Sequence, residues 1–143
     1  MKLFLDTGGL LAVLDRSDEN HSECSDFWRK MLTERTYEPV ISDYVLDELV
    51  TRVRYDISHN KALQILSTLM ELVRRGRLKL IWVNQDYFSQ ARSIFERYND
   101  QEFSFTDCTS FAICEEERIQ YVFALDRDFQ IFGLNLFPTG DGS

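Results

Sequence analysis

The sequence predicts an α/β protein in which helices cover the faces of a parallel sheet. Short apolar runs, typical of strands buried on both faces, alternate with longer segments whose apolar residues recur at helical spacing. Parallel strands need long connections, and helical segments between consecutive strands supply them. Two of the apolar runs end at an aspartate, Asp6 and Asp126. In such a sheet, strand ends and helix starts share the edge where ligands bind.

The first half of the chain contains two expected strands, each followed by two helices. The strands are 2–5 and 38–41. The first two helices are 8–14 and about 21–34, the second of which carries Trp28 as an expected core residue. Ser42 and Ser58 are expected to cap the next two helices, because each hydroxyl precedes an apolar stripe at helical spacing. The stripe after Ser58 includes Leu63 and Met70, and Gly76 is the expected stop of that helix.

The second half repeats the alternation and then ends on two strands. The expected elements are a strand at 78–83, a helix at 85–98, a loop at 99–105, a strand at 121–125, a turn at 126–129 and a strand at 134–137. Thr106 is expected to cap the helix that leads into 121–125, with Asp107 in its first turn. Phe88 and Phe95 are expected to face inward, and Trp82 to be a core residue. Residues 1–138 form one expected domain, followed by a short polar tail at 139–143.

Composition restricts the class of protein. A chain of 143 residues suits one domain with a sizeable core. The net charge of −8 argues against a high-affinity, nonspecific nucleic-acid binder, but not against an enzyme that meets phosphates through metal ions. The three cysteines form no CxxC pair and are expected to be buried free thiols. Without a signal-peptide pattern or an apolar run of membrane length, we expect a cytoplasmic protein with no membrane span.

Several carboxylates fall at comparable positions in this topology. Asp6, Asp107 and Asp126 lie at strand ends or at a helix start, and right-handed crossovers bring such positions to one edge of the sheet. Glu48 lies about two turns into the helix that follows the second strand, from where it can reach the same edge. Helical periodicity alone does not choose between Glu48 and its neighbour Asp47.

Unpaired carboxylates do not crowd together without help, because like charges raise each other's pKa. Few basic residues lie beside these acids in the sequence, so bound cations are the expected remedy. Carboxylate oxygens suit Mg²⁺ or Mn²⁺, and such ions can orient a phosphodiester and activate water. The arrangement therefore predicts metal-assisted phosphoester hydrolysis, although any one of these aspartates by itself is more often a turn former or a helix cap.

Four acidic motifs make the chain resemble the PIN-domain ribonucleases, and the VapC-type toxins in particular. The motifs occur in the order that the family shows, and the resemblance spans nearly the whole chain. The matching segments are Leu5–Thr7, Ser42–Glu48, Phe105–Asp107 and Leu125–Phe129. The chain departs from the family pattern after the first motif, where Gly8 and Gly9 stand in place of the Ser or Asn and aliphatic residues that are often found there.

The resemblance implies a three-layer α/β/α sandwich with a short, mostly parallel central sheet. It also implies a role for each matching side chain. The residues that would hold Mg²⁺ or Mn²⁺ and carry catalysis are Asp6, Glu48, Asp107 and Asp126. The supporting residues would be Thr7, Thr106 and Asp128. The candidate RNA contacts are Arg52, Arg54 and Arg127.

The activity that the resemblance implies is endonucleolytic cleavage of RNA by metal-activated water, leaving a 5′-phosphate and a 3′-hydroxyl. The protein would be the toxin of a toxin–antitoxin pair. Its partners would be an RNA substrate, a small antitoxin whose C-terminal segment fills the active-site groove, and a second copy of the chain. The candidate dimer surfaces are the helices between Ser42 and Val73.

Two other functions stay open from the sequence. One is a phosphatase or phosphotransfer domain with Asp6 as an aspartyl nucleophile, although Asp-Thr-Gly follows the first strand in place of the Asp-x-Asp of such phosphatases. The other is a PIN-like module that binds RNA or protein without cutting. The presence of all four acids argues against a PIN-like module that has lost its catalytic activity.

Overall fold

The centre of the molecule is a five-stranded sheet in which every neighbouring pair of strands is parallel. The computed structural model describes residues 1–138, so the expected polar tail at 139–143 lies outside the described residues. The strand order across the sheet is β3-β2-β1-β4-β5. The strands are β1 (Lys2–Leu5), β2 (Glu38–Ser42), β3 (Lys79–Ile81), β4 (Tyr121–Phe123) and β5 (Asn135–Phe137).

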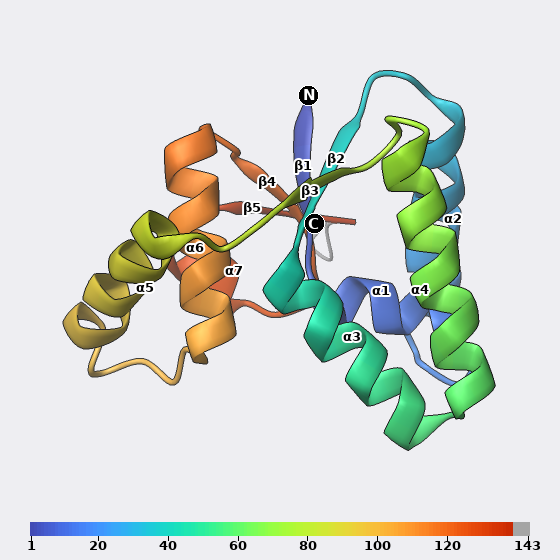
Figure 1. The fold of residues 1–143 in the computed structure, drawn as a ribbon, viewed down its shortest axis with the longest axis horizontal. Coiled ribbons are helices and arrows are strands. Elements are labelled where there is room, and N and C mark those ends of the chain that lie inside the picture. Colours follow the sequence, from blue (N-terminus) through green and yellow to red (C-terminus); the bar gives the residue numbers. More distant parts are fainter. Residues whose placement is uncertain (139–143) are drawn as a thin grey trace.

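Helices lie on both sides of this sheet, as expected of a three-layer α/β/α sandwich. In Figure 1, α5 and α6 lie on one side of the strands, and α1, α2 and α4 lie on the other. The helices within the described residues are α1 (Thr7–Leu14), α2 (His21–Thr33), α3 (Asp43–Asp56), α4 (His59–Arg74), α5 (Gln85–Arg97), α6 (Phe105–Glu117) and α7 (Asp128–Ile131).

The strand order places a topological switch point between β1 and β4. The chain builds the sheet outward from β1 to β2 and β3, then crosses back to place β4 on the other side of β1. Leu5 at the end of β1 pairs in register with Phe123 at the end of β4. Connections therefore leave the carboxyl ends of these two neighbouring strands in opposite directions, which opens a crevice where α/β proteins bind ligands.

Two glycines of α1 follow β1, and the second of them explains how closely α1 approaches the sheet. A Cβ atom on Gly9 would lie 2.8 Å from the main-chain oxygen of Phe123, which is closer than any side chain tolerates. The same atom on Gly8 would meet only an oxygen of Asp6, at 3.6 Å. Of the two glycines that depart from the family pattern, Gly9 therefore has a steric reason: only a residue without a Cβ lets α1 pack this closely on β4.

Several expected boundaries and caps need correction. The strand expected at 121–125 ends at Phe123, and the turn expected at 126–129 leads into the short helix α7, which begins at Asp128 and ends at Ile131. The helix expected to start at Thr106 starts at Phe105, because the hydroxyl of Ser104 caps it by accepting from the main-chain N–H of Asp107. The expected caps at Ser42 and Ser58 are confirmed.

Several side chains that the sequence predicted to be buried are exposed at the edges of the molecule. The expected core residue Trp82 is 65% exposed, since it follows the short edge strand β3, while Trp28 is half-buried against the core. Phe88 and Phe95, expected inside, are about half exposed, and each packs against the ring of Phe105. The helical stripe of α4 also leaves Leu63 and Met70 exposed.

All three cysteines are buried free thiols, as expected. Burial raises the pKa of Cys24 and of Cys108 to about 11 each, which keeps both neutral at physiological pH. Within residues 1–138, none of the helices combines the length and the apolar character that a membrane crossing requires.

Candidate active site

The first candidate carboxylate, Asp6, lies where β1 becomes α1. Its main-chain N–H donates to the main-chain oxygen of Phe123 at 3.0 Å, which continues the pairing of β1 with β4 by one residue. Its side chain then caps α1 by accepting from the N–H of Gly8 at 3.3 Å. This double role holds the carboxylate at the switch point and leaves only 6% of the residue exposed.

The second carboxylate, Glu48, reaches the same edge from α3. The hydroxyl of Thr7 donates to Oε1 of Glu48 at 2.7 Å, which ties the start of α1 to α3. Glu48 is half-buried, whereas its neighbour Asp47 is exposed on the helix. Helical periodicity did not choose between these two acids, and the resemblance selected Glu48. In the structure Glu48 bonds to Thr7 at the switch point, whereas Asp47 is exposed to solvent.

The third carboxylate, Asp107, is fixed by a capping box at the start of α6. Its side chain accepts from the main-chain N–H of Ser104 at 3.2 Å, while the Ser104 hydroxyl accepts from the N–H of Asp107 at 2.9 Å. Thr106, which the sequence suggested as the cap, contributes a main-chain oxygen that accepts from the Thr109 hydroxyl at 2.6 Å. The capping box orients a carboxylate that keeps its other oxygen available.

The remaining two carboxylates come from the loop after β4 and the start of α7. The main-chain N–H of Asp128 donates to Oδ1 of Asp126 at 2.9 Å. Carboxylate oxygens of Asp107, Asp126 and Asp128 all lie within 4.8 Å of one another. The sequence gave Asp128 only a supporting place, but it belongs to this closest trio of carboxylates, because the α7 turn brings it back beside Asp126.

Shifts in pKa show that these acids share one electrostatic environment. Burial, together with the negative charges of Asp107 and Glu48, raises the pKa of Asp6 to about 7. Burial, together with repulsion from Asp126 and Asp128, raises the pKa of Asp107 to about 6. The pKa of Asp128 is raised as well, by burial and then by Asp126. The repulsion therefore links acids that are up to 122 positions apart in the chain, from 6 to 128.

No basic side chain neutralises this cluster within residues 1–138. The ion pairs of this part of the chain involve none of Asp6, Glu48, Asp107, Asp126 or Asp128. Several close carboxylates with raised pKa values and no cationic partner are the donor set that a hard divalent cation fits, because it supplies the missing positive charge. The residues present therefore fit Mg²⁺ or Mn²⁺.

The three candidate RNA-contacting arginines divide into two groups. Arg52 is exposed, lies 4.0 Å from Asp56 and lines a hollow of about 510 Å³ together with Gly8 and Leu125. Arg127 is exposed and lines a second hollow, which Leu125 lines as well. In contrast, the guanidinium of Arg54 bonds to Nδ1 of His59 at 3.0 Å and lines neither hollow.

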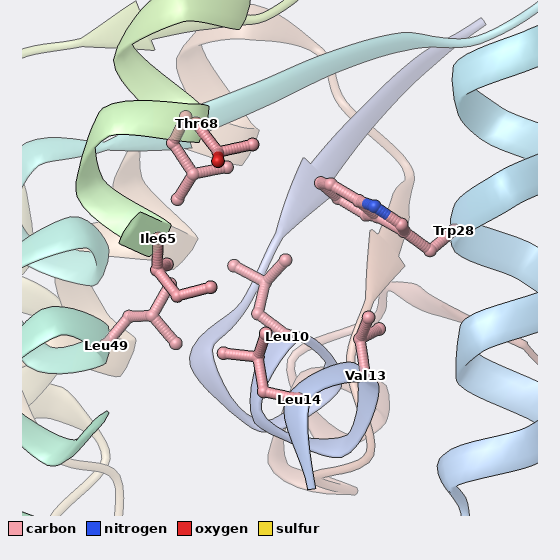
Figure 2. A pocket seen from close by; sticks show the side chains of 8 residues that line it. Leu10, Val13, Leu14, Trp28, Leu49, Ile65 and Thr68 are labelled. Atoms are coloured by element: carbon pink, nitrogen blue, oxygen red, sulfur yellow. The ribbon is translucent and has the colours of Figure 1, made fainter. Parts of the chain in front are cut away.

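A third hollow, shown in Figure 2, is apolar and carries no ionisable side chain. Trp28 of α2 closes one side of it against Leu10 and Val13 of α1, and Leu49 and Ile65 face them from α3 and α4. It has no group that could act on a phosphate. The clustered carboxylates, in contrast, lie at the switch point, and Leu125 lines both of the polar hollows described above.

The chain is thus a parallel α/β sandwich with unpaired carboxylates at its switch point, the edge at which proteins of this architecture bind their ligands. The family model for the PIN domain matches residues 3–133. The chain therefore belongs to the PIN domain family.

Relatives support this membership along almost the whole chain. The 23S rRNA-specific endonuclease VapC20 of Mycobacterium tuberculosis is 28% identical over 133 residues, which cover 92% of this chain and 94% of the relative. Ribonuclease VapC26 of the same organism is 27% identical over 132 residues, covering 87% of each chain.

Solved structures agree with the fold. The crystal structure of VapC20, described as a Sarcin-Ricin loop cleaving toxin, matches with a TM-score of 0.79 at 26% identity, over 92% of this chain and 95% of that one. The structure of VapBC2 from Rickettsia felis, bound to a DNA fragment from its promoter, matches with a TM-score of 0.68 at 16% identity, over 95% and 97% of the two chains.

Proposed function

We propose that this protein is a Mg²⁺- or Mn²⁺-dependent endoribonuclease and the toxin of a toxin–antitoxin pair. The observation that carries the proposal is the cluster of mutually repelling, unpaired carboxylates at the switch point of a PIN domain. The names of the relatives VapC20 and VapC26 describe RNA-cleaving enzymes, which supports RNA as the substrate.

In this proposal the carboxylates position the ion. Asp6, Glu48, Asp107 and Asp126 would hold it, and the closeness of Asp128 to the last two supports a direct or water-mediated part for that residue as well. A bound divalent cation supplies a Lewis acid that polarises the phosphate and makes water a better nucleophile.

The other groups of the chain would orient the carboxylates and the RNA. The Thr7 hydroxyl fixes one oxygen of Glu48, and the capping box of α6 fixes the aspartate at its start. Arg52 and Arg127 line two hollows that share Leu125, where they would meet the phosphates that flank the cleaved bond. No histidine base is required, and the RNA 2′-hydroxyl does not attack.

The test is cleavage of labelled RNA by purified protein with Mg²⁺, with Mn²⁺ and with EDTA. Asp107→Asn should lower the rate by at least about 100-fold, because it removes a charged ligand and keeps the capping acceptor. Asp47→Asn is the matched control, since it removes the same charge from an exposed site of the domain. Full activity of Asp107→Asn, or activity unaffected by EDTA, would reject the proposal.

The partner proteins are also part of the proposal. Solved relatives include VapBC2 from Rickettsia felis and FitAcB from Neisseria gonorrhoeae, which supports an antitoxin partner encoded beside this chain. A homodimer stays a prediction. The expected surface on α3 and α4 exposes Tyr55 and Leu63, and Trp82 and Phe95 are exposed outside that surface. Light scattering on wild type and on Phe95→Asp would measure the mass and locate the contact.

Three buried free thiols suit a reducing compartment, and we place the protein in the cytoplasm on that basis.

A further inference from the structure

The hollow that Arg127 and Leu125 line combines polar and apolar side chains. It has a volume of about 390 Å³. Its apolar wall is made by Ala124, Leu136 and Pro138, which come from the chain after β4 and from the end of β5. Because Leu125 and Arg127 flank Asp126 in the sequence, this hollow and the acidic cluster are two sides of one loop.

The polar part of the hollow brings acceptors and donors together from two elements. Asn20 and Glu23 come from the start of α2, and Arg127 and Gln130 come from the start of α7. Asn20 occupies the N-cap position of α2, yet its side chain makes no capping hydrogen bond. Within residues 1–138, neither Glu23 nor Arg127 forms an ion pair, although both are exposed and line the same hollow. These groups are therefore available to a ligand.

We infer that this hollow binds a guanine base of the RNA next to the cleaved bond, an inference that rests on the proposed nuclease function. Guanine presents two acceptors, O6 and N7, to a guanidinium, and two adjacent donors, N1–H and the N2 amino group, to a carboxylate. Arg127, at the start of α7, would donate to O6 and N7, and Glu23, in the first turn of α2, would accept from N1–H and the N2 amino group. Adenine offers no pair of adjacent donors to Glu23, and pyrimidines offer no N7 to Arg127.

The position of the hollow relative to Leu125 explains how the base and the phosphate would be arranged. Leu125 lines both this hollow and the hollow that contains Gly8 and Arg52. A single RNA strand that crosses Leu125 would place guanine on one side and the next nucleotide on the other. The phosphate that joins the two nucleotides would then lie over Asp126, the residue after Leu125.

The test uses short, single-stranded RNAs with one guanine in a uridine background, and matched RNAs with adenine or inosine at that position. With Mg²⁺, the wild type should cut at a fixed distance from guanine, and at least about 5-fold more slowly when adenine replaces it. Inosine, which lacks the N2 amino group, should be intermediate. Glu23→Gln should bring the guanine and adenine rates together, while Glu19→Gln, the same change at an exposed residue outside the hollow, should keep the preference.

A second measurement separates this inference from the nuclease proposal. In NMR titrations, guanosine 5′-monophosphate should shift the main-chain signals of Asn20 and Ala124 more than adenosine 5′-monophosphate does. Mg²⁺-dependent cleavage with no base preference would overturn the guanine site and leave the nuclease proposal intact. If no RNA is cut, the nuclease proposal fails, and the titrations decide the site: equal or absent shifts with the two nucleotides would overturn it.

Discussion

Removing the buried charge of Asp6 should stabilise the protein and abolish its activity at the same time. Asp6 is 6% exposed, and burial together with neighbouring carboxylates raises its pKa from 3.8 to about 7. Asp6→Asn is close to isosteric, and an Asn oxygen can still accept from the N–H of Gly8, so the α1 cap survives. The variant thus removes a charge that the fold holds at a free-energy penalty.

The sign and the size of the effect follow from linkage. The folded protein keeps the Asp6 proton up to about pH 7, whereas the unfolded chain loses it near pH 3.8, so the folded state binds more protons between these values. Stability contributed by this group therefore falls as pH rises from about 4 to about 7. At 1.36 kcal/mol for each pKa unit, the penalty above pH 7 is at most about 4 kcal/mol. Asp6→Asn should be nearly neutral near pH 4 and most stabilising near pH 8.

Urea denaturation of wild type and Asp6→Asn, at pH 4.5 and pH 8 with EDTA present, measures this difference. Asp47→Asn, at the exposed position beside Glu48, corrects for the loss of one negative charge from a chain of net charge −8. Added Mg²⁺ should stabilise wild type at pH 8 and stabilise Asp6→Asn much less, since a bound cation relieves the same repulsion.

A gain for Asp6→Asn that is equal at the two pH values, or a loss of stability at pH 8, would refute the reasoning. Either result would mean that the Asp6 carboxylate is not held against repulsion in the folded state. Retention of RNA cleavage by Asp6→Asn would separately contradict its proposed part in holding the ion.

Three further changes test how the site is positioned. Gly9→Ala should lower the free energy of unfolding by about 1–3 kcal/mol, because the added Cβ meets the main chain of β4. Gly8→Ala should be neutral or stabilising. Equal effects of the two variants in thermal melts would contradict the close approach of α1 to β4. Ser104→Ala should cost about 1 kcal/mol through loss of the α6 cap, and Thr106→Ala much less; the reverse order in urea melts would restore the cap expected from the sequence. Thr7→Val should weaken Mg²⁺-dependent cleavage about 10–100-fold, because the Glu48 carboxylate loses the hydroxyl that orients it, and Thr7→Ser should restore cleavage. A Thr7→Val variant with wild-type metal dependence would refute this role of Thr7.

Local patterns in the sequence were enough to predict the architecture. Apolar runs such as 2–5 and 121–125 alternate with helical stripes, and this alternation leads to a parallel sheet because each crossover needs a helix. The same pattern placed Asp6 and Asp126 at strand ends, and the right-handed crossovers then fixed that they share an edge. The caps at Ser42 and Ser58 were also readable, since each depends on a few neighbouring residues.

Contacts between distant segments were decided only by the tertiary structure. Glu48 is separated from Asp47 by a hydrogen bond to Thr7, across 41 positions of the chain. Trp82 is exposed because β3 is an edge strand, a position that its own sequence does not encode. The hollow that contains Glu23 and Arg127 joins two elements that share no motif.

The sequence alone thus determined the order of elements and the acids that each strand end carries, because hydrophobic periodicity and capping act over a few residues. The tertiary structure decided which carboxylates repel one another, which aromatic rings stay outside and which hollows flank the site. These properties depend on distances across the sheet and between its layers, and no local pattern of residues specifies such distances.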